Sequence, residues 1–297
     1  MIERVAVFCK KMWDWFKSDR CFVRYFAEAF SLSNNLLLLT IVLLSIFITF
    51  LYMVLSAQLS INPKLSLIVI ILLSSALASG FFYTIKTFVD TKDNKEKIDK
   101  SDFKFAIETF CAGIGEHYLS FVCMFVMFFI LAGAIILGTF IIADNFICPL
   151  DKLGIDASTI FITLSDPSQI VNITQNMLPE QQTYLKYWYR AFLISTQTFT
   201  FLIMLWIPEV LYKKKNVFFA FFTSIGKIFS DFPRALCVYL TVVLLNYILA
   251  ILIVIFSNYG ILSFLLNLMS LYLLVFNFFA IFVYYRKMFV DERGWIA

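Results

Sequence analysis

Charged residues are scarce in this chain. Asp, Glu, Lys and Arg together make up 15% of its 297 residues, whereas 61% are hydrophobic. Too little polar surface remains to cover a soluble globule of this length. Most of the chain must therefore be solvated by lipid, and its 36 phenylalanines supply much of the apolar surface.

Motifs that carry chemistry are missing as well. The single histidine, His117 beside Glu116, excludes an HExxH motif and multi-histidine zinc sites. The sequence has no Walker loop, no GxSxG nucleophile elbow and no paired aspartates within an apolar stretch. We therefore expect a non-enzymatic protein with no catalytic residues, no cofactor and no metal site.

What the sequence does contain is a set of long apolar stretches. A transmembrane helix needs about 20 apolar residues to cross about 30 Å of hydrocarbon. Six stretches qualify: Leu36–Leu59, Leu65–Val89, Tyr118–Ala143, Trp188–Tyr212, Arg234–Ser257 and Ile261–Tyr285. The fourth is the most polar, but aromatic residues flank it, with Trp188 at one end and Trp206 at the other, as in an interfacial aromatic belt. The predicted fold class is an all-α integral membrane protein.

The connections divide the spans into hairpins. Ser60–Lys64 and Asn258–Gly260 are short enough to force antiparallel neighbours. The sequence thus predicts an N-terminal segment (1–35), a first membrane part (36–143), a loop (144–187), a second membrane part (188–285) and a tail (286–297). The loop is interpreted as a small cap or mobile flap, with a ligand-gating or partner-binding loop as the alternative.

Basic residues fix the expected orientation. With six spans, 20 of the 24 Lys and Arg residues fall on the side that holds both termini. Such residues are preferentially retained in the cytoplasm, so we expect an inner or plasma membrane protein with both termini cytoplasmic and the loop 144–187 outside. The net charge of +4 is then a topology signal, and we expect the lipid bilayer as the partner, not nucleic acid.

Three cytoplasmic stretches have helical periodicity and precede the hairpins. Aromatic and aliphatic residues recur at i, i+4, i+7 and i+11 in 101–116 and again in 216–231. A weaker stripe, Phe22, Phe26 and Phe30, precedes the first span. Such stripes favour amphipathic elbow helices in the headgroup plane, with packing against a neighbouring protein as the alternative. The stripe residues of the two matching segments are Phe103, Ile107, Phe110 and Ile114, and Phe218, Phe222, Ile225 and Phe229.

Two segments carry a family resemblance. The stretch "GFFYTIKTFVDTKDNKEKIDKSDFKFAIETF", from Gly80 to Phe110, and "VFFAFFTSIGKIFSDFPRAL", from Val217 to Leu236, lie within a pattern that covers about Ser18 to Arg286. This pattern resembles uncharacterised bacterial multi-pass membrane families related to the glycerophosphodiester phosphodiesterase membrane domain. The resemblance implies six helices and gives no catalytic residues. The long 144–187 loop departs from the family pattern.

Polar residues in or near the spans are few. Glu209 is expected at the interface beside Lys213–Lys215, where an ion pair is the plain interpretation. Asn246, Asn267 and Asn277 with Ser195–Thr200 are expected to form interhelical hydrogen bonds or, alternatively, to line a polar path. Small residues, including Gly80 and the Gly133/Gly138 pair, are expected to permit close helix packing.

Two functions follow as expectations. The first is a non-catalytic membrane protein that organises lipid or is accessory to a membrane complex. The alternative is a transporter or ABC-type permease subunit with a polar path between spans four and six. Its partner would then be an ATPase subunit, and a coupling helix would be needed in the Phe105–Gly115 stretch.

The topology makes a testable prediction about cysteines. Of the six, only Cys148 falls in the outer loop, so a membrane-impermeant thiol reagent added to intact cells should reach no other cysteine. Labelling of Cys9, Cys21 or Cys111 under those conditions would reverse the orientation.

Overall fold

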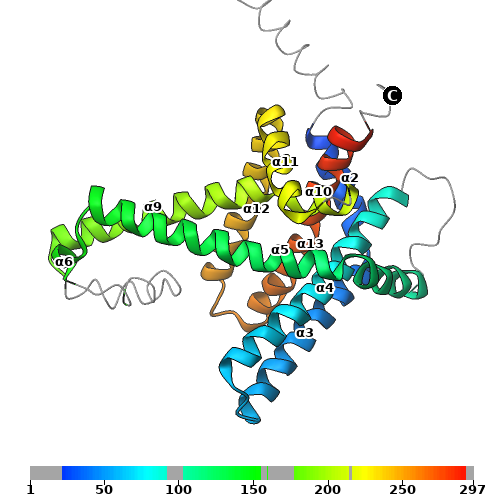
Figure 1. Ribbon diagram of the computed structural model, residues 1–297, viewed down its shortest axis with the longest axis horizontal. Helices are drawn as coiled ribbons and strands as arrows, with labels where there is room; N and C mark the ends of the chain where they lie inside the picture. Colours follow the sequence, from blue (N-terminus) through cyan, green and yellow to red (C-terminus); the bar gives the residue numbers. More distant parts are fainter. Residues whose placement is uncertain (1–21, 92–102, 155–158, 160–176, 214–215, 292–297) are drawn as a thin grey trace, which may run out of the picture. The chain divides into compact units, whose positions relative to one another are not determined.

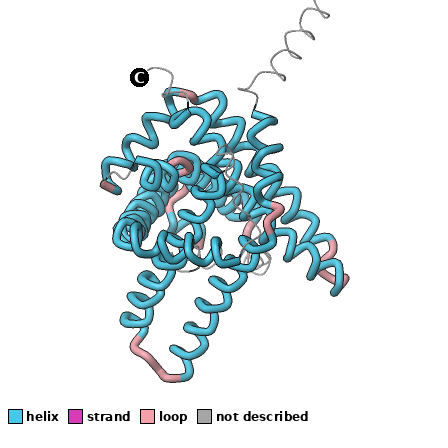
Figure 2. The backbone as a smooth tube through the Cα atoms, turned by 90° about the vertical axis from the view of Figure 1, so that its right-hand side faces the viewer, coloured by secondary structure: helices cyan, strands magenta, loops and turns pink. Residues whose placement is uncertain are grey.

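The computed structural model describes residues 22–91, 103–154, 159, 177–213 and 216–291 (Figure 1). Its regular structure within these ranges is helical, with no strand (Figure 2). Six helices of the described part are long and apolar enough to cross a membrane, and the predicted all-α membrane fold is confirmed. Most of the predicted N-terminal segment, the start of the second elbow, the middle of the outer loop and half of the tail lie outside the described residues.

The first hairpin follows the prediction closely. Helix α3 (Leu36–Gln58) and helix α4 (Pro63–Thr91) are joined by a tight turn in which Ser60 has a positive φ of 51°. Asn35 begins α3, its side chain accepting a hydrogen bond from the backbone of Leu37 at 3.0 Å. This side-chain cap satisfies one of the free N–H groups of the first turn, so the helix begins where the apolar run begins.

Helix α2 (Phe22–Ser33) packs lengthwise on helix α13 (Gly260–Arg286). Ring contacts pair Tyr25 with Tyr284 at 5.7 Å and Phe30 with Tyr272 at 6.4 Å, so the two helices run antiparallel. The side of α2 that faces the protein carries Tyr25, Ala29, Leu32 and Ser33, whereas Phe30, a member of the predicted stripe, is exposed. The first elbow is thus a packed helix, whose buried side differs from the expected one.

The second elbow and the third span form one helix, α5 (Phe103–Phe146), of 44 residues. The elbow 101–116 was predicted to end before the span that begins at Tyr118, but no proline interrupts this stretch and glycines alone do not end a helix. Within the stripe, Phe103 and Ile107 are exposed, whereas Phe110 packs against α4 at Gly80.

The fourth span is longer than predicted and broken. Helix α9 (Pro179–Ile203) begins before the expected Trp188, and helix α10 (Trp206–Lys213) follows after a two-residue turn. Pro208 lies in the first turn of α10, where a missing N–H is tolerated. This position explains why the chain restarts a helix at Trp206 and does not extend α9.

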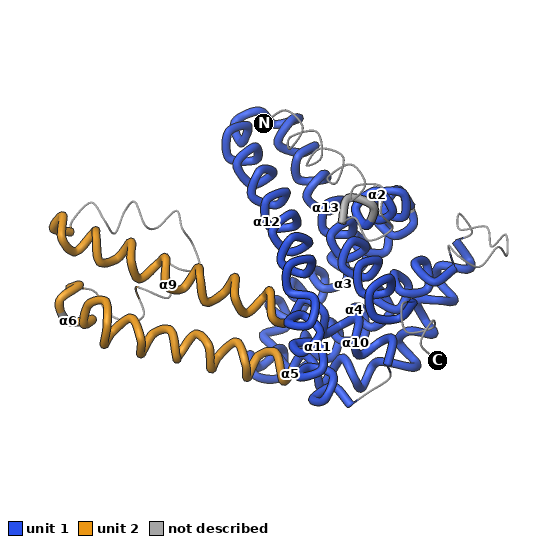
Figure 3. The backbone as a smooth tube through the Cα atoms, turned by 90° about the horizontal axis from the view of Figure 1, so that it is seen from above, with its two compact units in different colours: residues 1–125, 203–297 blue, residues 126–202 orange. Residues whose placement is uncertain are grey.

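The chain divides into two compact units, residues 1–125 with 203–297 and residues 126–202 (Figure 3). The second unit pairs the end of α5 with α9 antiparallel, as the contacts Phe128–Phe199 and Phe140–Trp188 show. Its core contains Ala143, Cys148, Leu153, Leu185, Trp188 and Phe192, where Leu153 belongs to the short helix α6 (Leu150–Leu153).

The position of Trp188 differs from the predicted interfacial aromatic belt. Its side chain is fully buried in this core, and its indole Nε1 donates to the carbonyl of Cys148 at 3.2 Å. Cys148 itself is 3% exposed. A thiol reagent would therefore need local opening to reach it, and Leu178→Cys, at a position 67% exposed, is the better reporter of the same loop.

The remaining helices belong to the first unit. Helix α11 (Val217–Ser230) matches the predicted third elbow, 216–231. Helix α12 (Phe232–Ile255) follows directly after Asp231 and forms the last hairpin with α13, which continues into a π-helical turn, η1 (Lys287–Asp291). Around α13 lies an aromatic core. Phe82 on α4 packs edge-to-face on Phe278 at 4.7 Å and stacks on Phe282 at 6.2 Å.

Two glycines set the closest approach of α4 and α5. A Cβ added to Gly113 would lie 2.5 Å from the Cβ of Tyr83 and 2.9 Å from the carbonyl oxygen of Ser79. A Cβ added to Gly80 would lie 2.9 Å from the carbonyl oxygen of Phe110. The expected packing role of Gly80 is confirmed. Gly133 and Gly138 differ, because an added Cβ would meet nothing described within 4 Å.

Gly113→Ala should therefore destabilise the protein, by about 1–3 kcal/mol, because backbone atoms cannot move aside as a flexible side chain can. Gly115→Ala is the matched control on the same helix, since its added Cβ would meet nothing within 4 Å, and should be neutral or slightly stabilising. Thermal unfolding of both variants in detergent micelles measures the difference. Equal midpoints would show that the crossing tolerates a methyl group.

Candidate functional site

The most unusual residue of the first unit is Glu209 on α10, whose side chain is fully buried. Its position follows from the helix start, where the backbone N–H of Glu209 donates to the carbonyl of Leu205 at 3.0 Å. Trp206, at the beginning of α10, donates through Nε1 to the carbonyl of Val217 at 3.0 Å. This bond fixes α10 against the first residue of α11.

Among the described residues, the basic side chain that pairs with Glu209 is Lys227 of α11. Its Nζ donates to Glu209 Oε2 and, at 2.6 Å, to the hydroxyl oxygen of Tyr285 on α13. The Tyr285 hydroxyl in turn donates to Glu209 Oε2. Lys227 is 5% exposed. Burying either charge alone would cost several kcal/mol, so the contact between them is what makes this arrangement tenable.

Aromatic rings complete the surroundings of the ammonium. Lys227 Nζ lies 4.5 Å from the ring centroid of Tyr285 and 5.2 Å from that of Phe289 in η1. Rings at these distances attract a cation through their quadrupole. We call the group formed by Glu209, Tyr285 and Phe289 the ammonium cage.

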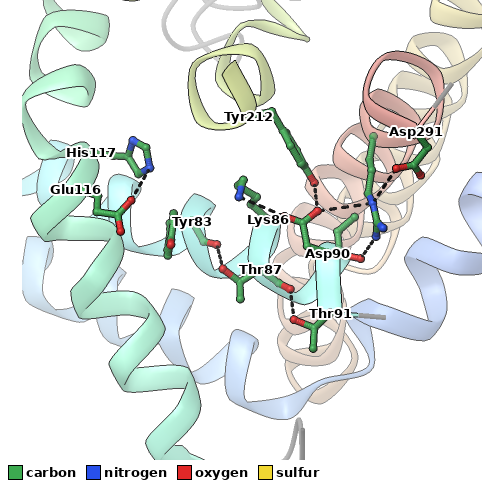
Figure 4. A network of polar contacts seen from close by, with 11 residues as sticks. Tyr83, Lys86, Thr87, Asp90, Thr91, Glu116, His117, Tyr212 and Asp291 are labelled. Carbon is green, nitrogen blue, oxygen red and sulfur yellow. Dashed lines mark hydrogen bonds and ion pairs between the residues drawn. The ribbon is translucent and has the colours of Figure 1, made fainter. Parts of the chain in front are cut away.

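A second polar network, drawn in Figure 4, centres on Asp90 of α4. The Tyr212 hydroxyl on α10 donates to Asp90 of α4 at 2.9 Å, and its ring stacks on Tyr285 at 5.4 Å. Lys86 lies 3.2 Å from Asp90, on the other side of the same carboxylate. Arg286 lies 3.6 Å from Asp90 and 3.5 Å from Asp291, and it donates to the carbonyl of Val89.

Together the cage and this network balance their charges. Lys86, Lys227 and Arg286 face Asp90, Glu209 and Asp291. Hydrogen bonds and ion pairs thus join α4, α10, α11, α13 and η1 at the end of the first unit where these helices meet. Chemically the arrangement can hold a cation and position hydroxyl groups; it presents no activated nucleophile with a general base beside it.

The structure corrects the expected position of Glu209. Glu209, expected at the interface beside Lys213–Lys215, is buried and meets Lys227, 18 residues along the chain. His117 on α5 is buried as well: it is 5% exposed, with its ring 5.4 Å from that of Tyr83 and its Nε2 3.7 Å from Glu116. No group of three or more His, Cys, Asp or Glu side chains in the described ranges could hold a metal ion.

The asparagines of the spans differ in burial and in hydrogen bonding. Asn246 and Asn267 are exposed, and each donates to a carbonyl of its own helix, Val242 at 2.7 Å and Ser263 at 2.8 Å. Asn277 is buried within the first unit. The pair Glu209–Lys227 could not be predicted from the sequence, because each residue has a neighbour of opposite charge nearer in the sequence. That neighbour is Lys213 for Glu209 and Asp231 for Lys227. The only signal was that Lys227 interrupts an otherwise uncharged α11.

Comparison with known proteins gives no relative: no family model matches the chain, and neither a curated protein nor a solved structure is significantly similar to it.

The buried pair can be tested by a double-mutant cycle. Lys227→Met or Glu209→Leu alone should destabilise the protein by about 3–5 kcal/mol, because each removes the charge that meets the other. The double variant should recover most of that loss, since neither charge is then buried. Unfolding of the purified protein in one detergent measures all four members of the cycle.

The matched control is the exposed pair Lys104–Glu108, whose atoms lie 3.8 Å apart on side chains 79% and 65% exposed. Lys104→Met and Glu108→Leu should each change stability by less than about 0.5 kcal/mol. Additive effects of the two buried substitutions, with no recovery in the double variant, would contradict the coupling.

Proposed function

We propose that this chain is a non-catalytic multi-pass protein of the inner or plasma membrane, with both termini cytoplasmic. It organises lipid or is accessory to another membrane complex, and it acts through its apolar outer surfaces. Relation to the membrane domain of glycerophosphodiester phosphodiesterases is part of the same proposal and rests on the sequence resemblance.

The observation that carries the proposal is the outward side of α11. Phe218, Phe219, Phe222 and Phe229 are 54–66% exposed there, and the single charged residue of the helix, Lys227, points inward to Glu209. The distribution is the reverse of that on a water-facing helix. An uncharged aromatic surface of this kind suits lipid.

The length and ends of α11 support a position at the membrane boundary. Its 14 residues span about 21 Å, too short to cross the hydrocarbon core. Lys213 precedes it, and Asp231 with Arg234 follows it at the start of the span α12. Charges at both ends with none on the outward side favour a helix that lies along the interface.

The free energies of membrane binding that apolar and basic side chains contribute differ in size. Inserting a phenylalanine side chain contributes about 1.5–3 kcal/mol, whereas a basic residue near anionic lipid adds about 1 kcal/mol. Three aromatic side chains of α11 thus contribute about 4.5–9 kcal/mol, compared with about 3 kcal/mol for the three basic residues Lys213–Lys215. The apolar side should hold the helix at the bilayer, and the charge should adjust its position.

The test replaces Phe218, Phe222 and Phe229 together by Ser. Vesicles of phosphatidylethanolamine and phosphatidylglycerol with deuterated chains report the order of the lipid around the protein. The wild-type protein should change the chain order parameters, and the triple variant should lose most of that change while remaining folded. A nitroxide on Gly226→Cys, an exposed position on α11, should move from oxygen-accessible to water-accessible depth.

Lys104→Gln, an exposed charge on α5, is the control and should behave like the wild type. Equal lipid order around wild-type and triple-variant protein would refute the lipid-organising role. Loss of a co-purifying membrane protein from the triple variant, with unchanged nitroxide depth, would assign α11 to a partner protein.

The second candidate is a transporter or ABC-type permease subunit with a polar path between spans four and six. In its favour, Asn277 in the sixth span is buried, and its Oδ1 has no hydrogen-bond partner among the described residues. Against it, Asn246 and Asn267 bond to their own helices. Solute uptake by sealed vesicles that falls in Asn277→Leu would favour this function over the first.

A further inference from the structure

The ammonium cage has the composition of a cation-recognition site. Lys227 Nζ is met by a carboxylate, a hydroxyl oxygen at 2.6 Å and two aromatic rings at 4.5 and 5.2 Å. Carboxylates and hydroxyl oxygens accept the N–H groups, while the rings attract the charge. In this structure the occupant is a side chain of the protein itself.

The walls of the cage come from elements other than α11. Glu209 belongs to α10, Tyr285 to α13 and Phe289 to η1, whereas α11 supplies the ammonium. Lys227 therefore occupies the cage as a tethered ligand.

Contacts that do not involve α11 hold two of these walls, Tyr285 and Phe289. Tyr285 stacks on Tyr212, whose hydroxyl donates to Asp90 at 2.9 Å. Phe289 packs edge-to-face on Tyr284 at 6.0 Å and lies 5.6 Å from Tyr285. A site built before its occupant arrives loses little freedom on binding.

We propose that this cage is an ammonium-binding site that α11 fills with Lys227, and that it takes a primary ammonium on a short alkyl chain when Lys227 is removed or displaced. Primary ammonium offers three N–H donors to Glu209 and Tyr285, whereas a quaternary ammonium offers none. The source is either a soluble amine or an ethanolamine headgroup. The headgroup source rests on the proposed function, in which α11 lies among lipid headgroups.

The first experiment is chemical rescue of Lys227→Ala in the full chain. Ethylammonium chloride should raise its thermal unfolding midpoint saturably, by about 2–4 °C. Sodium chloride and tetramethylammonium chloride at equal concentration should not. The Glu209→Gln/Lys227→Ala variant should show no rescue by ethylammonium. A folded Lys227→Ala protein that responds equally to all three salts would overturn the proposal.

A second measurement keeps Lys227 in place and does not depend on that variant folding. Ser224 is buried on the inner side of α11, so Ser224→Cys, in a background without the six native cysteines, reports displacement of the helix. Maleimide labelling should be several-fold faster with ethylammonium, or in phosphatidylethanolamine vesicles compared with phosphatidylcholine vesicles. Equal rates in all conditions would overturn displacement by any amine.

The two arms separate the sources of the ligand. A response to ethylammonium alone assigns the cage to soluble amines, whereas a response to phosphatidylethanolamine assigns it to a lipid headgroup. Neither readout uses the Phe218, Phe222 and Phe229 surface. The lipid-order experiment with the triple Ser variant therefore tests the proposed function separately from the cage.

Discussion

A charge buried among apolar helices requires a charge of opposite sign beside it, and the contact between Glu209 and Lys227 is the point on which the first unit depends. Three helices, α10, α11 and α13, meet there. Such pairs often add little net stability compared with apolar residues of the same volume, but they penalise every arrangement that separates them. We infer that the pair fixes the register of α11, since rotation or sliding of that helix would leave both charges buried and apart.

The same contact explains how charged and aromatic side chains are distributed around α11. With the only charged side chain turned inward, the outward side is left to phenylalanines. A soluble protein places charges outside and aromatic residues inside, whereas α11 has the opposite distribution. The neighbouring network of Asp90, Tyr212 and Arg286 continues the pattern, because each of its charges meets a partner within the protein.

Sequence reasoning predicted what depends on local composition. The six spans, the short hairpin turns and the third elbow follow from the length of apolar runs and from helical periodicity. It failed where tertiary contacts decide. The burial of Glu209, His117 and Trp188 could not be read from the sequence, because interface and interior favour the same residue types. The extent of α5 was missed for another reason: charged residues at its beginning suggested a boundary, although nothing there breaks a helix.

The unbroken helix α5 is longer than crossing a bilayer requires. Its 44 residues measure about 66 Å, more than twice the hydrocarbon core of about 30 Å. Charged residues lie at its beginning, up to Glu116, and the next is Asp144. A helix adapts to a thinner membrane by tilting. Even with tilt, the hydrocarbon core takes only the uncharged stretch between Glu116 and Asp144, and the charged turns from Phe103 to Glu116 continue the helix beyond it.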